Sequence, residues 1–379
     1  MDIYEELGVK KVVNAAGTYT VVGATRMSDE TLEAMRQAAS SYVSIEELQK
    51  VIHEKVAKLT NNEAAYICNS CSTALYLCAA ACIAKKQGRK FKYIDNEIVS
   101  KSEFVGIWSQ HIPYDHAIEQ LGAKMRFIGY TNPTATLTKE DLEMSFNENT
   151  VGVYFAPRTP RGYIGKSTLN LEDVIEVAHK HNLPVIVDAA AQLPPKSNLW
   201  TFTEMGGDMV TFSGGKDLSG PQASGLVVGK KEYIDIVSKI GFPNYDAGRL
   251  MKIGREEIIA LYSAVKQYME NDEEKRLVWC ENEIKKLKEL VDSEYFTVER
   301  CWPNQAGQPL PRAFVRISDK TDISGDDLSE MLMEFNPSVF CFSENQNGVF
   351  INPMCMKNGD MEYVAEKLNE IKNILKKRG

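Results

Sequence analysis

The feature that most constrains the fold is a series of short apolar segments that alternate with helical patterns between residues 64 and 229. We expect strands at 64–68, 124–128, 151–156, 184–188, 209–212 and 225–229. These segments are apolar on both faces, as strands are in a parallel sheet that helices cover on both sides. The pattern therefore predicts a large α/β domain with a mostly parallel sheet.

A helix is expected to begin after an N-cap at Ser28, since the acidic residues at 29 and 30 suit the positive end of a helix. Apolar residues recur with helical period through 48–59. We expect an N-terminal segment over 1–45 that packs on the active site, followed by the large domain over 46–250.

The chain after residue 250 has a different pattern. A long helical stretch over 256–290 precedes two short apolar segments, at 296–300 and 313–317, and a last helix near 361–376. This order predicts a small α+β C-terminal domain over 251–379.

The charge balance limits the partners. The chain has 44 Lys and Arg against 52 Asp and Glu, a formal charge of −8. Proteins that bind nucleic acid through their overall charge carry a basic field, so we expect no nucleic-acid partner. No segment reaches the roughly 18 apolar residues of a membrane helix, and the acidic start lacks the pattern of a secretory signal. Small anionic ligands need only a few local cations and remain possible.

The cysteines are candidate metal ligands. Four of the eight lie within 68–82, and the spacing of Cys68 and Cys71 suits zinc. However, Cys78 and Cys82 lie in an apolar segment that is expected to be a buried helix, and no histidine is near. We therefore expect no metal site, and free thiols typical of the cytoplasm.

Polar residues at the ends of predicted strands are candidates for a ligand site, because open α/β sheets bind ligands there. Asp188 follows the apolar run 185–187 and precedes three alanines, 189–191. A cap of the following turn is its simplest role. The alanines also leave room for a flat group.

Lys216 follows another predicted strand and two glycines that permit a tight turn. A lysine in such a turn is usually only solvated, but this turn closes a core strand. A third place is 68–73, between the first strand and its helix. Ser70 or Ser72 there would cap the helix, and the free N–H groups would also suit a phosphate.

Together these three places describe the requirements of pyridoxal 5′-phosphate (PLP). The lysine forms a Schiff base, the aspartate keeps the pyridine nitrogen protonated and the helix end holds the phosphate. In order and spacing they resemble the fold-type-I, aspartate aminotransferase-like PLP enzymes. More closely, the chain resembles the selenocysteine synthase-like (L-seryl-tRNA selenium transferase-like) group, which includes D-glucosaminate-6-phosphate ammonia-lyase. The matching stretches are 7–18, 25–28, 114–117, 184–191, 212–225 and 248–254.

The resemblance implies a role for each matching residue. Lys216 carries the cofactor, Asp188 pairs with its ring nitrogen, and Ser213 helps to hold the phosphate. Ala190 lies against one face of the ring. These residues form the expected core of the site.

Two parts of this site depart from the pattern of the group. The histidine that usually covers the other face of the ring is replaced by Gln110, with His111 next to it. The phosphate loop reads Asn69-Ser70-Cys71-Ser72, where Ser-Gly-Ala-Ala is commoner. Backbone N–H donors survive such changes, so we expect Ser70, Cys71 and Ser72 to bind the phosphate.

Cations at matching places indicate an anionic substrate. In the relatives, an Arg-x-x-Arg stretch and an arginine of the opening segment bind the substrate anion, and here these places hold Arg249, Lys252 and Arg26. Arg158 and Arg161 are further candidates that would bind a carboxylate or phosphate in bidentate fashion. A surface ion pair is the alternative role for each.

We therefore expect a PLP-dependent carbon–nitrogen lyase that acts on an anionic hydroxy-amino acid, phosphorylated ones such as D-glucosaminate 6-phosphate included. Lys216 would remove the α-proton, a β-hydroxyl would leave and ammonia would follow by hydrolysis. Aminotransferase, racemase and β-replacement reactions use the same machinery and remain alternatives. The resemblance also implies a homodimer or a higher homo-oligomer.

Two other classes of protein are disfavoured. A tRNA-dependent selenium transferase of bacteria carries an extra N-terminal RNA-binding domain, whereas this sequence begins directly at the matching segment, and its charge is −8. A catalytically silent, regulatory fold is disfavoured because Lys216 and Asp188 are both present.

Overall fold

The computed structural model describes residues 2–88, 95–131, 134–157, 167–344 and 347–378. It contains two compact units, one of residues 27–271 and one of residues 1–26 with 272–379. These boundaries differ from the expected ones at 45/46 and 250/251. The reason is that α2 (Asp29–Ala39) and α11 (Arg255–Glu270) pack on each other within the larger unit.

The larger unit is built on a central sheet, which has seven strands among the described residues, in the order β2-β8-β7-β6-β5-β3-β4. The strands are β2 (Ala64–Cys68), β3 (Glu103–Ile107), β4 (Lys124–Ile128), β5 (Thr150–Phe155), β6 (Val185–Asp188), β7 (Met209–Ser213) and β8 (Gly225–Gly229). Only β8 runs antiparallel to its neighbours within this set. The mostly parallel α/β sheet is confirmed, and β3 is a strand that the sequence pattern did not predict.

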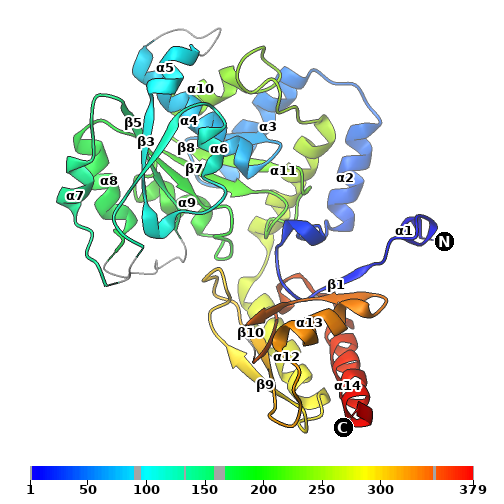
Figure 1. The fold of residues 1–379 in the computed structure, drawn as a ribbon. Helices are drawn as coiled ribbons and strands as arrows, with labels where there is room; N and C mark the ends of the chain where they lie inside the picture. Colours follow the sequence, from blue (N-terminus) through cyan, green and yellow to red (C-terminus); the bar gives the residue numbers. More distant parts are fainter. Residues whose placement is uncertain (1, 89–94, 132–133, 158–166, 345–346, 379) are drawn as a thin grey trace. The chain divides into compact units, whose positions relative to one another are not determined.

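Helices cover both faces of this sheet (Figure 1). One face packs against α3 (Ile45–Leu59), α8 (Leu171–Lys180), α9 (Asn198–Glu204) and α11. The other face packs against α4 (Cys71–Gln87), α6 (His116–Glu119) and α10 (Lys231–Ile240). The unit also contains the short helices α5 (Asn96–Lys101) and α7 (Lys139–Met144). This three-layer arrangement explains why the strands are apolar on both faces.

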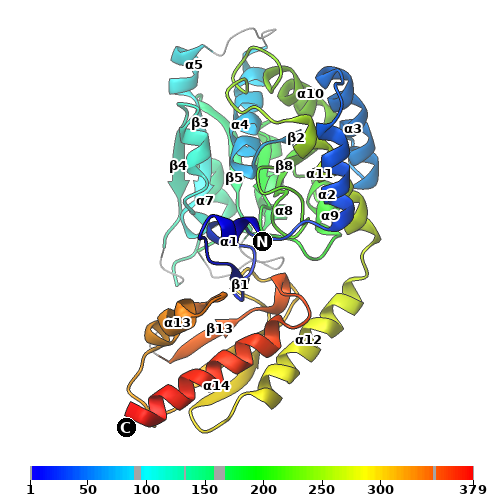
Figure 2. The same cartoon turned by 90° about the vertical axis from the view of Figure 1, so that its right-hand side faces the viewer.

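The smaller unit combines an antiparallel sheet with helices. Its strands, in sheet order, are β12 (Phe342–Glu344), β13 (Gly348–Ile351), β10 (Arg312–Ile317) and β9 (Phe296–Cys301). Figure 2 shows α12 (Glu273–Leu290) and α14 (Asp360–Arg378) side by side, and with α13 (Gly325–Glu334) they cover an apolar core. From the opening segment, α1 (Ile3–Glu6) precedes β1 (Val12–Asn14), which pairs in parallel with β11 (Ser338–Phe340). The expected α+β character of the C-terminal part is confirmed.

Local capping explains where two expected helices begin and end. The helix expected after Ser28 forms as α2, and the Ser28 hydroxyl accepts a hydrogen bond from the N–H of Thr31 at 3.1 Å. The helical stretch expected over 256–290 forms, but as two helices. Asp272 caps the N-terminus of α12 by accepting from the N–H of Lys275, so the stretch divides into α11 and α12.

The described part of the chain contains no helix that is both long and apolar enough to cross a bilayer. None of the eight cysteines, all of which lie within the described residues, forms a disulfide bond.

Candidate active site

The register of the sheet brings distant parts of the sequence to one edge. Gly225 on β8 lies between Cys68 on β2 and Ser213 on β7. Asp188, the last residue of β6, is paired with Thr211 on β7, two residues before Ser213. Because β2, β6 and β7 run in the same direction, their carboxyl ends meet at this edge, where open α/β sheets bind ligands.

The N-terminus of α4 lies at the same edge. Ser70 is the N-cap, and its hydroxyl accepts a hydrogen bond from the N–H of Thr73 at 3.0 Å. Cys71 and Ser72 are the first two residues of the helix, so no carbonyl of their own helix accepts their N–H groups. These N–H groups and the helix dipole make the helix end suitable for an anion.

Asp188 is a buried carboxylate, only 5% exposed. Its Oδ1 accepts a hydrogen bond from the N–H of Ala190 at 3.1 Å, and its Oδ2 accepts one from the hydroxyl of Tyr154 at 3.0 Å. Burial raises the pKa of Asp188, against the opposing effects of the Ala190 N–H, the charge of Lys216 and the Tyr154 hydroxyl. The carboxylate is therefore held by neutral groups in a poorly solvated place.

The half-buried Cys71 joins the start of α4 to this carboxylate. Its Sγ lies 3.8 Å from Oδ1 of Asp188 and 3.4 Å from the hydroxyl of Thr211. Burial, followed by the negative charge of Asp188, raises the pKa of the Cys71 thiol well above its ordinary value. The thiol thus stays protonated and acts as a weak donor.

Lys216 lies on the turn that follows β7 and is half-buried. The turn is closed by a hydrogen bond from the N–H of Gly220 to the carbonyl of Gly214, at 2.8 Å. The next residue, Asp217, is buried and accepts a hydrogen bond from the hydroxyl of Tyr268 at 2.7 Å. These contacts fix the backbone on both sides of Lys216, whose Nζ lies 5.7 Å from the ring centroid of Tyr114.

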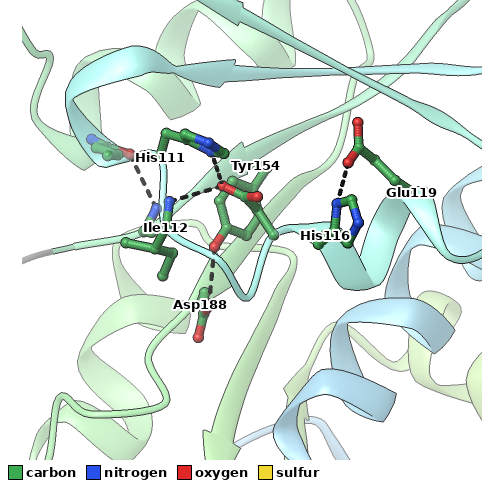
Figure 3. A network of polar contacts seen from close by, with 9 residues as sticks. His111, Ile112, His116, Glu119, Tyr154 and Asp188 are labelled. Carbon is green, nitrogen blue, oxygen red and sulfur yellow. Dashed lines mark hydrogen bonds and ion pairs between the residues drawn. The ribbon is translucent and has the colours of Figure 1, made fainter. Parts of the chain in front are cut away.

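The segment after β3 carries the residues expected over the cofactor ring. The buried Gln110 side chain accepts from the N–H of Ala156 at 3.1 Å and donates to the Thr168 hydroxyl at 3.1 Å. The Nδ1 of His111 lies 2.7 Å from Oδ2 of Asp115, and the N–H of Ile112 donates to the same oxygen. Figure 3 shows Tyr154 between this segment and Asp188. The role of Gln110 and His111 at the ring stays a prediction.

The candidate substrate cations lie in different parts of the chain. Arg249 and Lys252 follow α10 in the larger unit, and the Arg249 guanidinium lies 5.4 Å from the ring centroids of both Phe242 and Tyr245. Arg26 belongs to the smaller unit, where it contacts Asp360 at 3.9 Å. Arg161 lies outside the described residues.

The structure thus brings together Ser70, Cys71, Ser72, Asp188, Ala190, Ser213 and Lys216. Sequence reasoning missed Tyr154, because a tyrosine within the apolar run 150–155 looks like any other core residue. It also gave no role to Asp115 or Tyr114, which lie in the segment 114–117 that matches the family pattern. A helix end, a buried carboxylate and a lysine at one sheet edge define a site for a flat anionic group with a basic ring nitrogen.

Comparisons with known proteins agree with this class. The family model described as L-seryl-tRNA selenium transferase matches residues 12–294. A D-glucosaminate-6-phosphate ammonia lyase from Salmonella typhimurium (strain 14028s / SGSC 2262) is 26% identical over 377 residues, which are 98% of each chain. A 5′-C-glycyluridine monooxygenase-decarboxylase from Streptomyces sp is 25% identical over 377 residues, 97% of this chain and 91% of that protein. The solved structure of a D-glucosaminate-6-phosphate ammonia-lyase has a TM-score of 0.83 at 25% identity and covers 99% of both chains.

The chain belongs to the L-seryl-tRNA selenium transferase family, a family of PLP-dependent enzymes, and the resemblance read from its sequence is confirmed. One structural observation shows that the residues of the site fit PLP. Asp188 is buried, and its hydrogen-bond partners among the described residues are all neutral. The negative charge therefore remains available for a cationic ring nitrogen.

Proposed function

We propose that this chain is a PLP-dependent ammonia lyase that acts on an anionic 2-amino-3-hydroxy acid. The observation that carries the proposal is the meeting of the α4 N-terminus, Asp188 and Lys216 at one sheet edge. The likeness to an ammonia lyase over 98% of both chains supports the reaction class.

Each part of the site would hold one part of the cofactor. The N–H groups of Cys71 and Ser72, with Ser213, would bind the phosphate. Asp188 would pair with the ring nitrogen, and Ala190, two residues further on, would lie against the ring. When bound, PLP supplies an aldehyde that links to amino groups and a cationic ring that draws electrons from the substrate.

Lys216 would act on the substrate as well as hold the cofactor. Its amine would take the proton from Cα of the substrate, and the hydroxyl on Cβ would leave as water. Hydrolysis then returns one water and releases ammonia and a 2-oxo-3-deoxy acid. The substrate therefore loses ammonia overall, and no oxidant or amino acceptor is consumed.

The substrate would be a small anion of the kind that the Salmonella relative is named for, such as D-glucosaminate 6-phosphate. Arg249 and Lys252 in the larger unit, together with Arg26 and Arg161, are the cations proposed to bind its carboxylate or phosphate. The net charge of −8 disfavours a nucleic-acid partner.

We also propose a homodimer or higher homo-oligomer in the cytoplasm. Large apolar side chains are left exposed on the larger unit, Tyr42 at 99%, Leu250 at 92% and Tyr245 at 82%. A second copy would cover such side chains. The absence of disulfide bonds among the described cysteines fits a reducing compartment. Analytical ultracentrifugation tests the assembly, and a fully active monomer would refute it.

The central test is reduction of the PLP-loaded protein with borohydride, followed by peptide mapping. The label should lie on the peptide that contains Lys216, and Lys216→Ala should be colourless. Lys239→Ala is the matched control, because Lys239 is an exposed lysine of the same unit and should leave the label in place. Label on another lysine would overturn the assignment.

Product analysis tests the reaction. A lyase releases ammonia and a 2-oxo acid in equal amounts, in the absence of oxygen and of any 2-oxo acid acceptor. An aminotransferase needs the acceptor, a racemase releases neither product and a monooxygenase-decarboxylase needs oxygen. Screening plain and phosphorylated D- and L-hydroxy-amino acids would identify the substrate.

A further inference from the structure

Tyr154 reaches Asp188 because of the sheet register. Tyr154 on β5 is paired with Ile186 on β6, and Asp188 is two residues beyond Ile186. Since alternate residues of a strand share a face, Tyr154 and Asp188 lie on the same face, the one that α4 covers. The Tyr154 side chain is 1% exposed, and its hydroxyl donates to Oδ2 of Asp188 at 3.0 Å (Figure 3).

The direction of this hydrogen bond is set by the surroundings of the phenol. Burial raises the pKa of Tyr154, and the charges of Asp188 and Asp115 raise it further, so the hydroxyl keeps its proton. The Oδ2 of Asp115 already lies 2.7 Å from Nδ1 of His111 and accepts from the N–H of Ile112. The phenol proton is therefore directed to Asp188.

A second buried aspartate in the same unit shows that the hydrogen-bond partners of Asp188 are unusual. Asp208 is 2% exposed, but Lys230 Nζ lies 2.7 Å from its Oδ1 and His179 Nε2 lies 2.9 Å from its Oδ2. Cationic and ionisable partners thus stabilise Asp208. The direct donors to Asp188 are instead Tyr154, the Ala190 N–H and the Cys71 thiol, and its nearby cation is Lys216.

We propose that Tyr154 is a positioning residue, whose hydroxyl holds the Asp188 carboxylate ionised and in one orientation for the ring nitrogen of the cofactor. This inference rests on the proposed function, because it assigns Asp188 to that nitrogen. Tyr154 acts only through Asp188. A charge-neutral donor suits this task, since it orients the carboxylate without cancelling the charge that the ring nitrogen needs.

The test compares two cofactors on the full chain. PLP has the ring nitrogen, whereas 1-deaza-pyridoxal 5′-phosphate has a carbon in its place. A hydrogen bond to a charged group supports about a 10- to 150-fold effect, so Tyr154→Phe should weaken PLP binding by that factor. The same variant should leave the affinity for the deaza analogue unchanged. Equal weakening of both ligands, or of neither, would overturn the proposal.

Tyr66→Phe is the matched control. Tyr66 is also 1% exposed, and its hydroxyl donates to the carbonyl of Phe242 at 3.0 Å, away from Asp188. This variant should lower stability without changing the ratio of the two affinities. If Tyr154→Phe alone does not fold, the double variant Asp188→Asn/Tyr154→Phe is used instead. In the double variant the carboxylate is replaced by a neutral amide, so the loss of the Tyr154 hydroxyl no longer leaves a buried charge without a donor. The double variant should show the same affinity ratio as Asp188→Asn, and a further fall in that ratio would contradict the proposal.

Failure of the proposed function gives a different result. If wild-type protein carries no PLP on Lys216 after borohydride reduction, the cofactor assignment itself is wrong. If wild-type protein binds PLP there and Tyr154→Phe binds both ligands normally, only the role of Tyr154 is wrong.

Discussion

Gly225 on β8 faces the backbone of Ser70 so closely that a Cβ at this position would collide with the Ser70 carbonyl group and lie 2.7 Å from the nitrogen of Cys71. We predict that Gly225→Ala displaces the N-terminus of α4. Overpacking of this kind costs about 1–3 kcal/mol of stability, and the displaced N–H groups should also bind phosphate less well. Equilibrium titration with PLP, and separately with inorganic phosphate, would measure the loss.

The matched control is Gly254→Ala. The atoms nearest to a Cβ there would be the carboxylate ends of Glu256 and Glu257, which are flexible side chains. Its PLP affinity should be that of the wild type. If Gly225→Ala binds PLP as well as Gly254→Ala does, the α4 N-terminus is not the phosphate site.

The second prediction concerns the stability of the cofactor-free protein. Burial raises the pKa of Asp188 above its ordinary value of 3.8. The folded state therefore favours the protonated acid more than the unfolded state does, and the stability falls as the pH rises from 3.8 through that raised pKa. Asp188→Asn should raise the free energy of unfolding at neutral pH by ~0.5–2 kcal/mol while it abolishes turnover, and chemical denaturation would measure it.

Asp208→Asn should have the opposite effect. This substitution removes the partner of Lys230 and His179, so it should lower stability at neutral pH.

The gain in stability from Asp188→Asn should disappear below pH 3.8, where Asp188 is protonated in both the folded and the unfolded state. A cofactor-free Asp188→Asn variant that is less stable at neutral pH would contradict the prediction.

The third prediction concerns acid unfolding. His53 is 8% exposed, its Nε2 accepts the N–H of Ile67 at 3.0 Å, and burial lowers its pKa from 6.5 to about 4. Its contribution to stability is present above pH 6.5 and is lost as the pH falls towards 4. At 1.36 kcal/mol for each pKa unit, the loss is about 3 kcal/mol. His53→Gln keeps an acceptor without titrating, so it should remove this part of the pH dependence, as urea denaturation would show.

His116→Gln is the control for this experiment, because the His116 side chain is 66% exposed. It should leave the slope between pH 6.5 and 4 as in the wild type. An unchanged slope in His53→Gln would show that His53 does not govern acid stability.

Much of the site was predictable because strand ends and helix starts leave local signals. Asp188 and Lys216 follow apolar runs, and Ser70 precedes a helix, so each was found without knowledge of the sheet order. Tyr154 could not be found in this way, since its partner is fixed by the pairing of β5 with β6. The break between α11 and α12 depends on a single cap at Asp272, which a helical pattern on both sides concealed.

The last prediction concerns the substrate anion. Arg249 lies over the rings of Phe242 and Tyr245, so its guanidinium is already oriented by its own loop. A charge-assisted contact contributes about 1.5–3 kcal/mol, so Arg249→Ala should lower kcat/KM by about 10- to 150-fold. PLP should remain bound, because Arg249 is not assigned to the cofactor. Arg249→Lys keeps the charge but lacks the planar guanidinium fork, and it should recover only part of the activity.

Two outcomes would contradict this role of Arg249. If Arg249→Ala loses PLP, the residue serves the cofactor phosphate. If Arg249→Ala keeps its activity and loses only the cation–π contribution to stability, about 0.5–1 kcal/mol, the role of Arg249 is confined to the loop.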